Sequence, residues 1–114
     1  MSEAKNVQEL TDAMNAFVEA MGWYRSDSRF KQSPRNIAIS LSLEAAEVLE
    51  HFQWGESADP EELAEELADV MLYLLQLAYL TGIDLTEAVE DKLAVNYGRF
   101  GPTDPDAAAE GPTD

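Results

Sequence analysis

Two pairs of acidic residues, each with its members three positions apart, could hold a divalent metal ion. The first pair is Glu44 and Glu47, and the second is Glu66 and Asp69. At about 100° per residue, the two members of each pair project from one side of a helix. Both pairs border apolar stripes, so on consecutive antiparallel helices the four carboxylates would meet at one seam. Such acids repel and desolvate one another unless a cation compensates, and residues 36–90 contain no Lys or Arg.

Oxygen ligands of this kind favour Mg²⁺ or Mn²⁺ over softer metals. Because Mg²⁺ usually shares its coordination with substrate phosphates, the pattern predicts a site for phosphoryl chemistry. An alternative stays open, in which both pairs are ordinary solvated acids. A di-iron carboxylate site needs Glu-x-x-His on two helices. The only histidine, His51, has Val48 and not Glu three residues before it. The sequence therefore excludes a di-iron carboxylate site.

The apolar spacing predicts four helices with short connections and no strand, an all-α four-helix bundle. Each predicted start carries a capping residue or an apolar 3-and-4 pattern, and Glu87 completes a capping box with Asp84. The predicted starts are Val7, Ser33-Pro34, Asp59-Pro60 and Asp84, and the predicted ends lie near Gly22, Trp54-Gly55, Gly82 and Gly98.

The second half of the third predicted helix is apolar over most of its circumference. A helix of this type is normally buried on all sides. We therefore expect it to lie in a dimer interface, and the alternative is the centre of a monomeric bundle. The residues concerned are Leu72, Leu74, Leu75, Leu77, Ala78 and Leu80.

Length and composition limit the class of protein. The chain has 114 residues, the usual size of one domain, and is 46% hydrophobic. Its 7 basic and 23 acidic residues give a net charge of −16, which argues against nucleic acid or an anionic membrane as a partner. There is no cysteine, and neither a signal peptide nor a membrane-length apolar run is visible. We expect a cytoplasmic protein, with a flexible acidic Pro/Gly/Ala tail at 101–114.

The segments SLSLEAAEVLEHFQW (40–54) and EELADVMLYLLQLA (65–78) resemble the MazG-like, all-α nucleoside triphosphate pyrophosphohydrolases. The nearest branch is that of the dCTP pyrophosphatases. The family signature, Glu-x-x-Glu followed by Glu-x-x-Asp, coincides with the two acidic pairs. The resemblance covers residues 6–100, so we place the domain at 1–100. It implies Mg²⁺-dependent hydrolysis of (deoxy)nucleoside triphosphates to a monophosphate and pyrophosphate, a role in cleansing the nucleotide pool, and assembly as a homodimer or homotetramer.

The resemblance also implies roles for single residues. Glu44, Glu47, Glu66 and Asp69 would hold the metal. Trp54 and Tyr73 would line the base pocket, with packing in the core as the alternative for both. Lys92, Asn96 and Arg99 would hold the triphosphate and sugar.

Two further assignments come from the chemistry of the residues. Glu47 is the candidate general base. Lys31 lies in one of the two segments, 25–35 and 92–99, that hold six of the seven basic residues, where phosphate-binding cations are expected. The preferred base and sugar stay open. A non-enzymatic helical dimerisation module is the alternative function.

Overall fold

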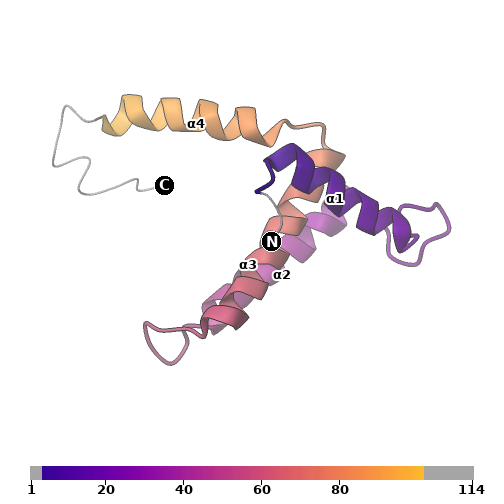
Figure 1. Ribbon diagram of the computed structural model, residues 1–114, viewed down its shortest axis with the longest axis horizontal. Coiled ribbons are helices and arrows are strands. Elements are labelled where there is room, and N and C mark those ends of the chain that lie inside the picture. Colours follow the sequence, from indigo (N-terminus) through magenta and orange to yellow (C-terminus); the bar gives the residue numbers. More distant parts are fainter. Residues whose placement is uncertain (1–3, 102–114) are drawn as a thin grey trace. The chain divides into compact units, whose positions relative to one another are not determined.

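A computed structural model describes residues 4–101 of the chain. Its elements are α1 (Val7–Ala20), α2 (Pro34–Glu50), α3 (Pro60–Leu80) and α4 (Leu85–Phe100) (Figure 1). No strand occurs within residues 4–101. The prediction of an all-α chain with four helices is therefore confirmed. The predicted tail lies, apart from Gly101, outside the described residues.

Side-chain caps fix where the helices begin. Asn6, Ser33, Asp59 and Asp84 each accept a hydrogen bond from a backbone N–H of the first turn, which satisfies one of the N–H groups that a helix start leaves unpaired. The cap of α1 is reciprocal with Glu9. At α4 the Glu87 N–H donates to Asp84, but the return bond from the Glu87 side chain is absent within residues 4–101, so the predicted capping box is only half formed. Gly22 and Gly82 follow α1 and α3 with φ of 75° and 71°, a conformation that glycine adopts without strain.

Two predicted helix ends are wrong. Helix α2 ends at Glu50, before Trp54, and the N–H groups of Phe52 and Gln53 bind carbonyls three residues back in successive tight turns. Trp54 is 93% exposed, so no tertiary packing holds another α-helical turn there. Helix α4 continues through Gly98 to Phe100, because one glycine weakens a helix by only about 1 kcal/mol.

The chain divides into two compact units, one up to Ile83 and one from Asp84. In the first unit, α2 and α3 run side by side and α1 also contacts α3 (Figure 1). The second unit contains α4. The packing of α4 into a bundle with the other helices stays a prediction.

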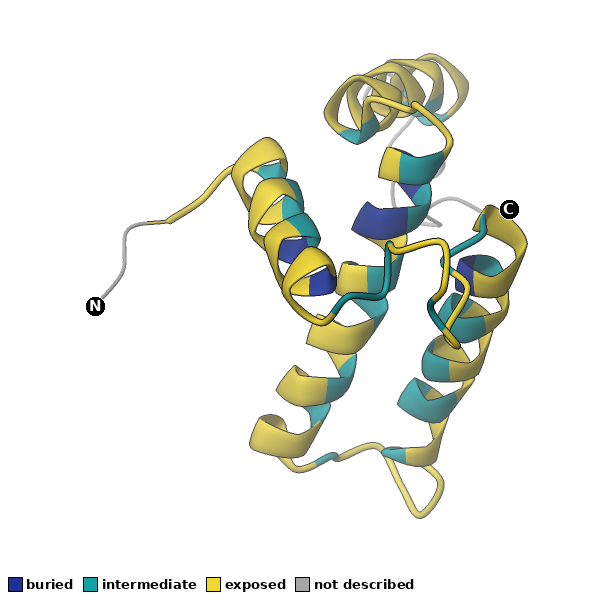
Figure 2. Cartoon of the chain, turned by 90° about the vertical axis from the view of Figure 1, so that its right-hand side faces the viewer, coloured by how far each residue is buried: buried dark blue, intermediate teal, exposed yellow. Residues whose placement is uncertain are grey.

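The core of the first unit is small and lies where α1 and α2 meet α3 (Figure 2). Its buried apolar residues are Met14, Val18, Ile37, Leu75 and Ala78. Leu72 and Leu74 remain exposed, so α1 and α2 do not enclose the apolar second half of α3. No single helix within residues 4–101 is long and apolar enough to cross a membrane. The helices α3 and α4 meet the criterion of length and composition only when they are taken together, and a break in the helix separates them.

Candidate active site

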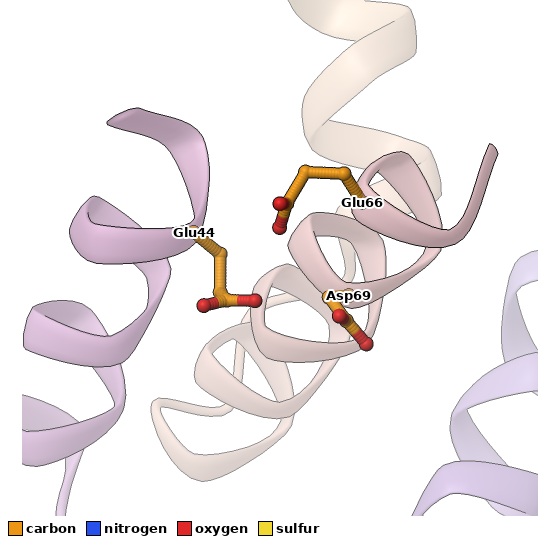
Figure 3. A group of neighbouring side chains, drawn as sticks. All are labelled: Glu44, Glu66 and Asp69. Atoms are coloured by element: carbon orange, nitrogen blue, oxygen red, sulfur yellow. The ribbon is translucent and has the colours of Figure 1, made fainter. Parts of the chain in front are cut away.

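Three of the four predicted metal ligands converge between α2 and α3. Glu44 comes from α2, and Glu66 and Asp69 come from α3 (Figure 3). One carboxylate oxygen of each residue lies within 4.8 Å of those of the other two. The packing of the two helices brings one acid of the first pair to both acids of the second, which are three of the four residues that the sequence pattern predicted to meet. Three acids so close form a site of high negative charge.

The surroundings of these acids favour a bound cation. Glu66 Oε2 is buried and has no hydrogen-bond partner among residues 4–101, while Oε1 lies 3.4 Å from His51 Nε2. Burial, together with the nearby carboxylates of Glu47 and Glu66, raises the pKa of Glu44 to about 7. Both features are unfavourable to ionised carboxylates without a counter-charge. The donor set, all carboxylate oxygens, fits Mg²⁺ or Mn²⁺.

Glu47 lies outside this group of three. It is half-buried and lines a cavity of about 360 Å³ that also reaches Glu66 and His51. We call this the acidic cavity. Four residues after Glu47 on the chain, His51 caps the end of α2. The contact between His51 and Glu66 was not predicted, because it depends on α3 running back past the end of α2.

A second cavity, the apolar slot, lies between α1 and α3 and has a volume of about 420 Å³. Phe17 and Trp23, whose rings meet edge to face with centroids 5.5 Å apart, belong to its wall. Asp69, Tyr73 and Gln76 contribute its polar side chains. The slot therefore joins aromatic surface to one member of the acidic cluster. From the sequence, Phe17 and Trp23 could equally have been core residues.

A third cavity, the polar cavity, measures about 430 Å³ and shares Trp23, Tyr73 and Gln76 with the apolar slot. Its other side carries Lys31 and Asn36. The Asn36 Nδ2 donates to the Lys31 carbonyl over 3.1 Å, which ties the start of α2 to the loop before it. Tyr73 thus borders both cavities, and Asp69 of the acidic cluster borders one of them.

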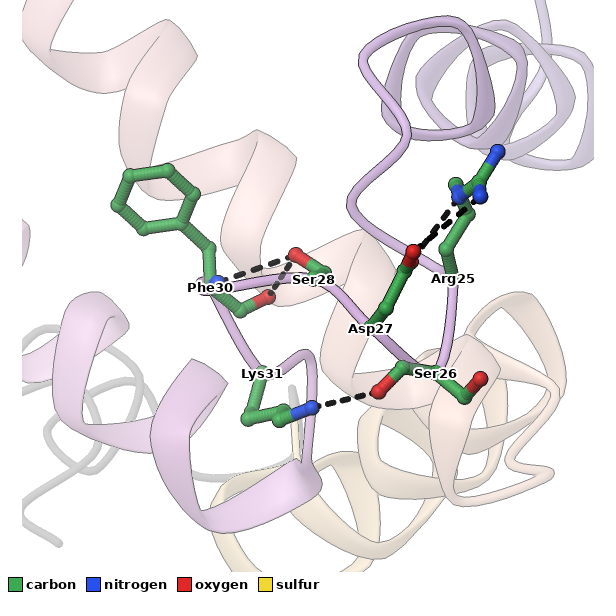
Figure 4. A network of polar contacts seen from close by, with 6 residues as sticks. All are labelled: Arg25, Ser26, Asp27, Ser28, Phe30 and Lys31. Carbon is green, nitrogen blue, oxygen red and sulfur yellow. Dashed lines mark hydrogen bonds and ion pairs between the residues drawn. The ribbon is translucent and has the colours of Figure 1, made fainter.

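The loop that supplies Lys31 is held by its own polar contacts (Figure 4). Lys31 Nζ donates to the Ser26 carbonyl over 2.7 Å, and Ser28 Oγ accepts from the Phe30 N–H. Arg25 pairs with Asp27 at 3.0 Å. Arg25 is thus engaged within the exposed loop, whereas Lys31 borders the polar cavity.

The structure leaves the roles of four predicted substrate-binding residues untested. Trp54 stands exposed in the turn after α2 and is not among the residues that line these three cavities. Lys92, Asn96 and Arg99 belong to α4 and hence to the second unit. Their contributions to a nucleotide site stay predictions.

Sequence reasoning overlooked one buried residue at the site. Gln76 is 3% exposed and borders both the apolar slot and the polar cavity. Its signal was present in the sequence, because it is the single polar residue of the run from Leu74 to Ala78. A buried amide needs hydrogen-bond partners, and in a helix so apolar it marks a position with a polar neighbour.

Comparison with known proteins is decisive for the family. Residues 39–106, more than half of the chain, match the model of the MazG-like family. The chain belongs to the MazG-like family. A solved pyrophosphatase structure from Archaeoglobus fulgidus has the same fold, with a TM-score of 0.69 and 35% identity over 88% of this chain and 96% of that one.

Curated relatives of this MazG-like chain include dCTP pyrophosphatase 1 of the rat, 38% identical over 77 residues, which are 59% of this chain and 45% of that protein. The human dCTP pyrophosphatase 1 is 36% identical over the same shares. A dATP/dGTP diphosphohydrolase of cyanophage S-2L is 53% identical over 34 residues, 30% of this chain and 32% of that protein. The chain spans about half the length, or less, of these relatives. It is homologous to pyrophosphatases, which hydrolyse phosphoanhydride bonds.

Proposed function

We propose that this chain hydrolyses (deoxy)nucleoside triphosphates to a nucleoside monophosphate and pyrophosphate, with Mg²⁺ as the metal and Mn²⁺ as a substitute. The observation that carries the proposal is the convergence of Glu44, Glu66 and Asp69 beside two cavities that share Tyr73. Membership of the MazG-like family supports it. In this proposal the protein removes unwanted nucleotides from the pool.

The metal would be held by Glu44, Glu66 and Asp69, with Glu47 completing the set or reaching it through water. The buried, unpartnered Glu66 Oε2 supports a bond from this oxygen to a cation. When bound, Mg²⁺ supplies positive charge at the phosphates and makes an attacking water more acidic.

The protein's own residues then bind and orient the nucleotide and move one proton. A water oxygen attacks the α-phosphorus, the bond from that phosphorus to the bridging oxygen breaks, and pyrophosphate leaves. Glu47, which borders the acidic cavity next to Glu66, accepts the proton of the attacking water at its carboxylate. Lys31 at the polar cavity offsets part of the charge of the triphosphate. As the family resemblance implies, Lys92 and Arg99 would add positive charge and Asn96 a hydrogen bond, so that these three residues would hold the triphosphate and sugar.

The base would lie against Tyr73, in the aromatic-walled space that Trp23 also borders. Trp54 would join the base pocket upon assembly or ligand binding, because it is exposed in the single chain. We further propose a homodimer or homotetramer, which the exposure of Leu43 and Leu72 on α2 and α3 supports.

The test is product analysis. Purified protein is incubated with each of the common deoxynucleoside triphosphates and Mg²⁺, and the products are separated by anion-exchange chromatography. We expect the monophosphate and pyrophosphate, with no turnover in excess EDTA. Nucleoside diphosphate and orthophosphate as primary products would contradict the proposal, as would turnover that is unaffected by the chelator.

A further inference from the structure

Gln76 is a buried amide at the place where the two nucleotide-sized cavities meet. Its side chain is 3% exposed, and it borders both the apolar slot and the polar cavity. It follows Asp69 by seven residues and Tyr73 by three, so the three side chains lie on one side of α3. A polar group buried in this way needs a reason, since its desolvation is costly.

The hydrogen bonds around Gln76 fix which end of its amide faces which neighbour. Gln32 Nε2 donates to the Phe30 carbonyl over 2.7 Å, and a backbone carbonyl can only accept. Gln32 therefore turns Oε1 toward Gln76, whose Nε2 donates to it over 2.7 Å. Rotating the Gln76 amide by half a turn would place two acceptor oxygens against each other.

A second contact holds the same orientation. The Gln76 Nε2 also reaches the hydroxyl of Tyr24 over 3.4 Å, and this hydroxyl donates to Asn15 Oδ1. Both N–H groups of Gln76 are thus directed at protein acceptors. Its carbonyl oxygen accepts no hydrogen bond recorded within residues 4–101, so Oε1 is the atom left to meet a ligand.

The position of Gln76 along α3 matches the outer edge of a bound base. Seven residues of helix separate it from Asp69, a rise of about 10 Å, and Tyr73 lies between them. A nucleotide with its phosphates at the acidic cluster and its base against Tyr73 would bring its outer edge to Gln76. At that edge cytosine and adenine carry an amino group, whereas thymine, uracil and guanine carry a carbonyl oxygen.

We infer that Gln76 Oε1 is a specificity determinant that selects nucleotides with an exocyclic amino group on the outer edge of the base, and that Gln32 and Tyr24 are its positioning residues. The inference rests on the proposed function. An amino group would donate to Oε1, while a keto oxygen would leave two acceptors facing each other.

The most closely matched substrates are dCTP and dUTP, which differ at this edge and at the adjacent ring nitrogen. For the wild type we expect kcat/KM for dCTP to exceed that for dUTP by about tenfold to a hundredfold. In Gln76→Met, which keeps the length of the side chain, this ratio should fall to within about threefold of one. Gln32→Ala should also lower the ratio, mainly by improving dUTP, because the Gln76 amide becomes free to turn.

If the role of Gln76 is purely structural, Gln76→Met should lower kcat/KM equally for dCTP and dUTP and leave their ratio unchanged. That result, or a wild-type ratio near one, overturns the inference. Glu65→Gln, an exposed change on the same helix, is the control and should keep the wild-type ratio. If Gln76→Met fails to fold by circular dichroism, the Gln32→Ala ratio decides.

Failure of the proposed function would look different. In that case no nucleotide releases pyrophosphate, and the same pair is compared by isothermal titration calorimetry with Mg²⁺ present. Tighter binding of dCTP than of dUTP in the wild type, lost in Gln76→Met, supports the role of Gln76 as a base reader even without turnover. Equal binding, or no binding of either nucleotide, overturns it.

Discussion

His51 at the end of α2 lies 3.4 Å, from Nε2 to Oε1, from Glu66 of α3, and the other carboxylate oxygen of Glu66 is buried without a partner. The histidine thereby contacts one oxygen and leaves the second without a hydrogen-bond partner among residues 4–101. A carboxylate held in this way is suited to bind a metal ion, because the neighbouring hydrogen bond fixes its orientation before the ion arrives.

Glu66→Gln should reduce turnover by at least about a hundredfold. Loss of a residue that hydrogen-bonds to a metal ligand costs about 10- to 100-fold, and loss of the charge of a ligand itself should cost more. In metal-free buffer the variant should be at least as stable as the wild type, because one of the crowded charges is gone. Activity assays and thermal melts in EDTA measure the two effects. Glu65→Gln, the exposed neighbouring residue, should leave both close to wild type. Near-normal turnover of Glu66→Gln would contradict the role of Glu66 as a metal ligand.

The raised pKa of Glu44, about 7 against an ordinary 4.5, predicts how stability depends on pH. Between these two values the folded state binds a proton at Glu44 that the unfolded state releases, so the contribution of Glu44 to stability is fully present below about 4.5 and is lost as pH rises through 7. Without metal, the melting temperature should therefore be lower at pH 8 than at pH 5. Glu44→Gln should flatten this part of the profile. A wild-type profile that rises from pH 5 to 8 in EDTA would contradict the assignment.

Mg²⁺ should restore stability at pH 8, because it binds the native state and not the unfolded state. At a concentration of one hundred times its dissociation constant, it should raise the free energy of unfolding by about 2.7 kcal/mol. The measurement is a thermal melt at pH 8 with and without Mg²⁺. The double variant Glu44→Gln/Glu66→Gln is the control and should show little stabilisation. Equal stabilisation of both proteins would mean that Mg²⁺ acts on the general excess of negative charge.

Tyr73→Ala should raise KM for the nucleotide by about tenfold, since stacking on an aromatic ring contributes about 1–3 kcal/mol per base. Tyr73→Phe keeps the ring and should stay close to wild type. Steady-state kinetics with one nucleotide suffices. If Tyr73→Phe raises KM as much as Tyr73→Ala does, then the hydroxyl group and not the ring is what binds the nucleotide.

Light scattering should give a mass of at least twice the 12.6 kDa of the chain at micromolar concentration. The reason is that Leu43 on α2 and Leu72 on α3 are 60% and 45% exposed. Exposed apolar patches on a protein surface often mark an interface. Leu43→Glu should shift the protein toward the monomer. A wild-type mass near 12.6 kDa would exclude the proposed dimer or tetramer.

Local signals in the sequence determined most of the fold. The capping side chains of Ser33 and Asp59 and the glycines at 22 and 82 act on their own helix ends. The end of α1, the start of α2 and both ends of α3 could therefore be predicted from neighbouring residues alone. The two acidic pairs were also visible, because each is a spacing within one helix. The end of α2 was not predictable, since the apolar pattern continues to Trp54 but nothing packs against it.

Only the tertiary structure decided how these elements meet. It grouped Glu44 with Glu66 and Asp69 and left Glu47 outside this group, although close to Glu44. It placed His51 against Glu66 and made Phe17 and Trp23 part of a cavity wall. It also joined Gln76 to Gln32 and Tyr24, far away in the sequence. Spacing along a helix fixes the side from which a residue projects, whereas the rotation and offset of two packed helices fix which side chains touch. Those two quantities depend on the whole of the core and leave no mark in any short segment of the sequence.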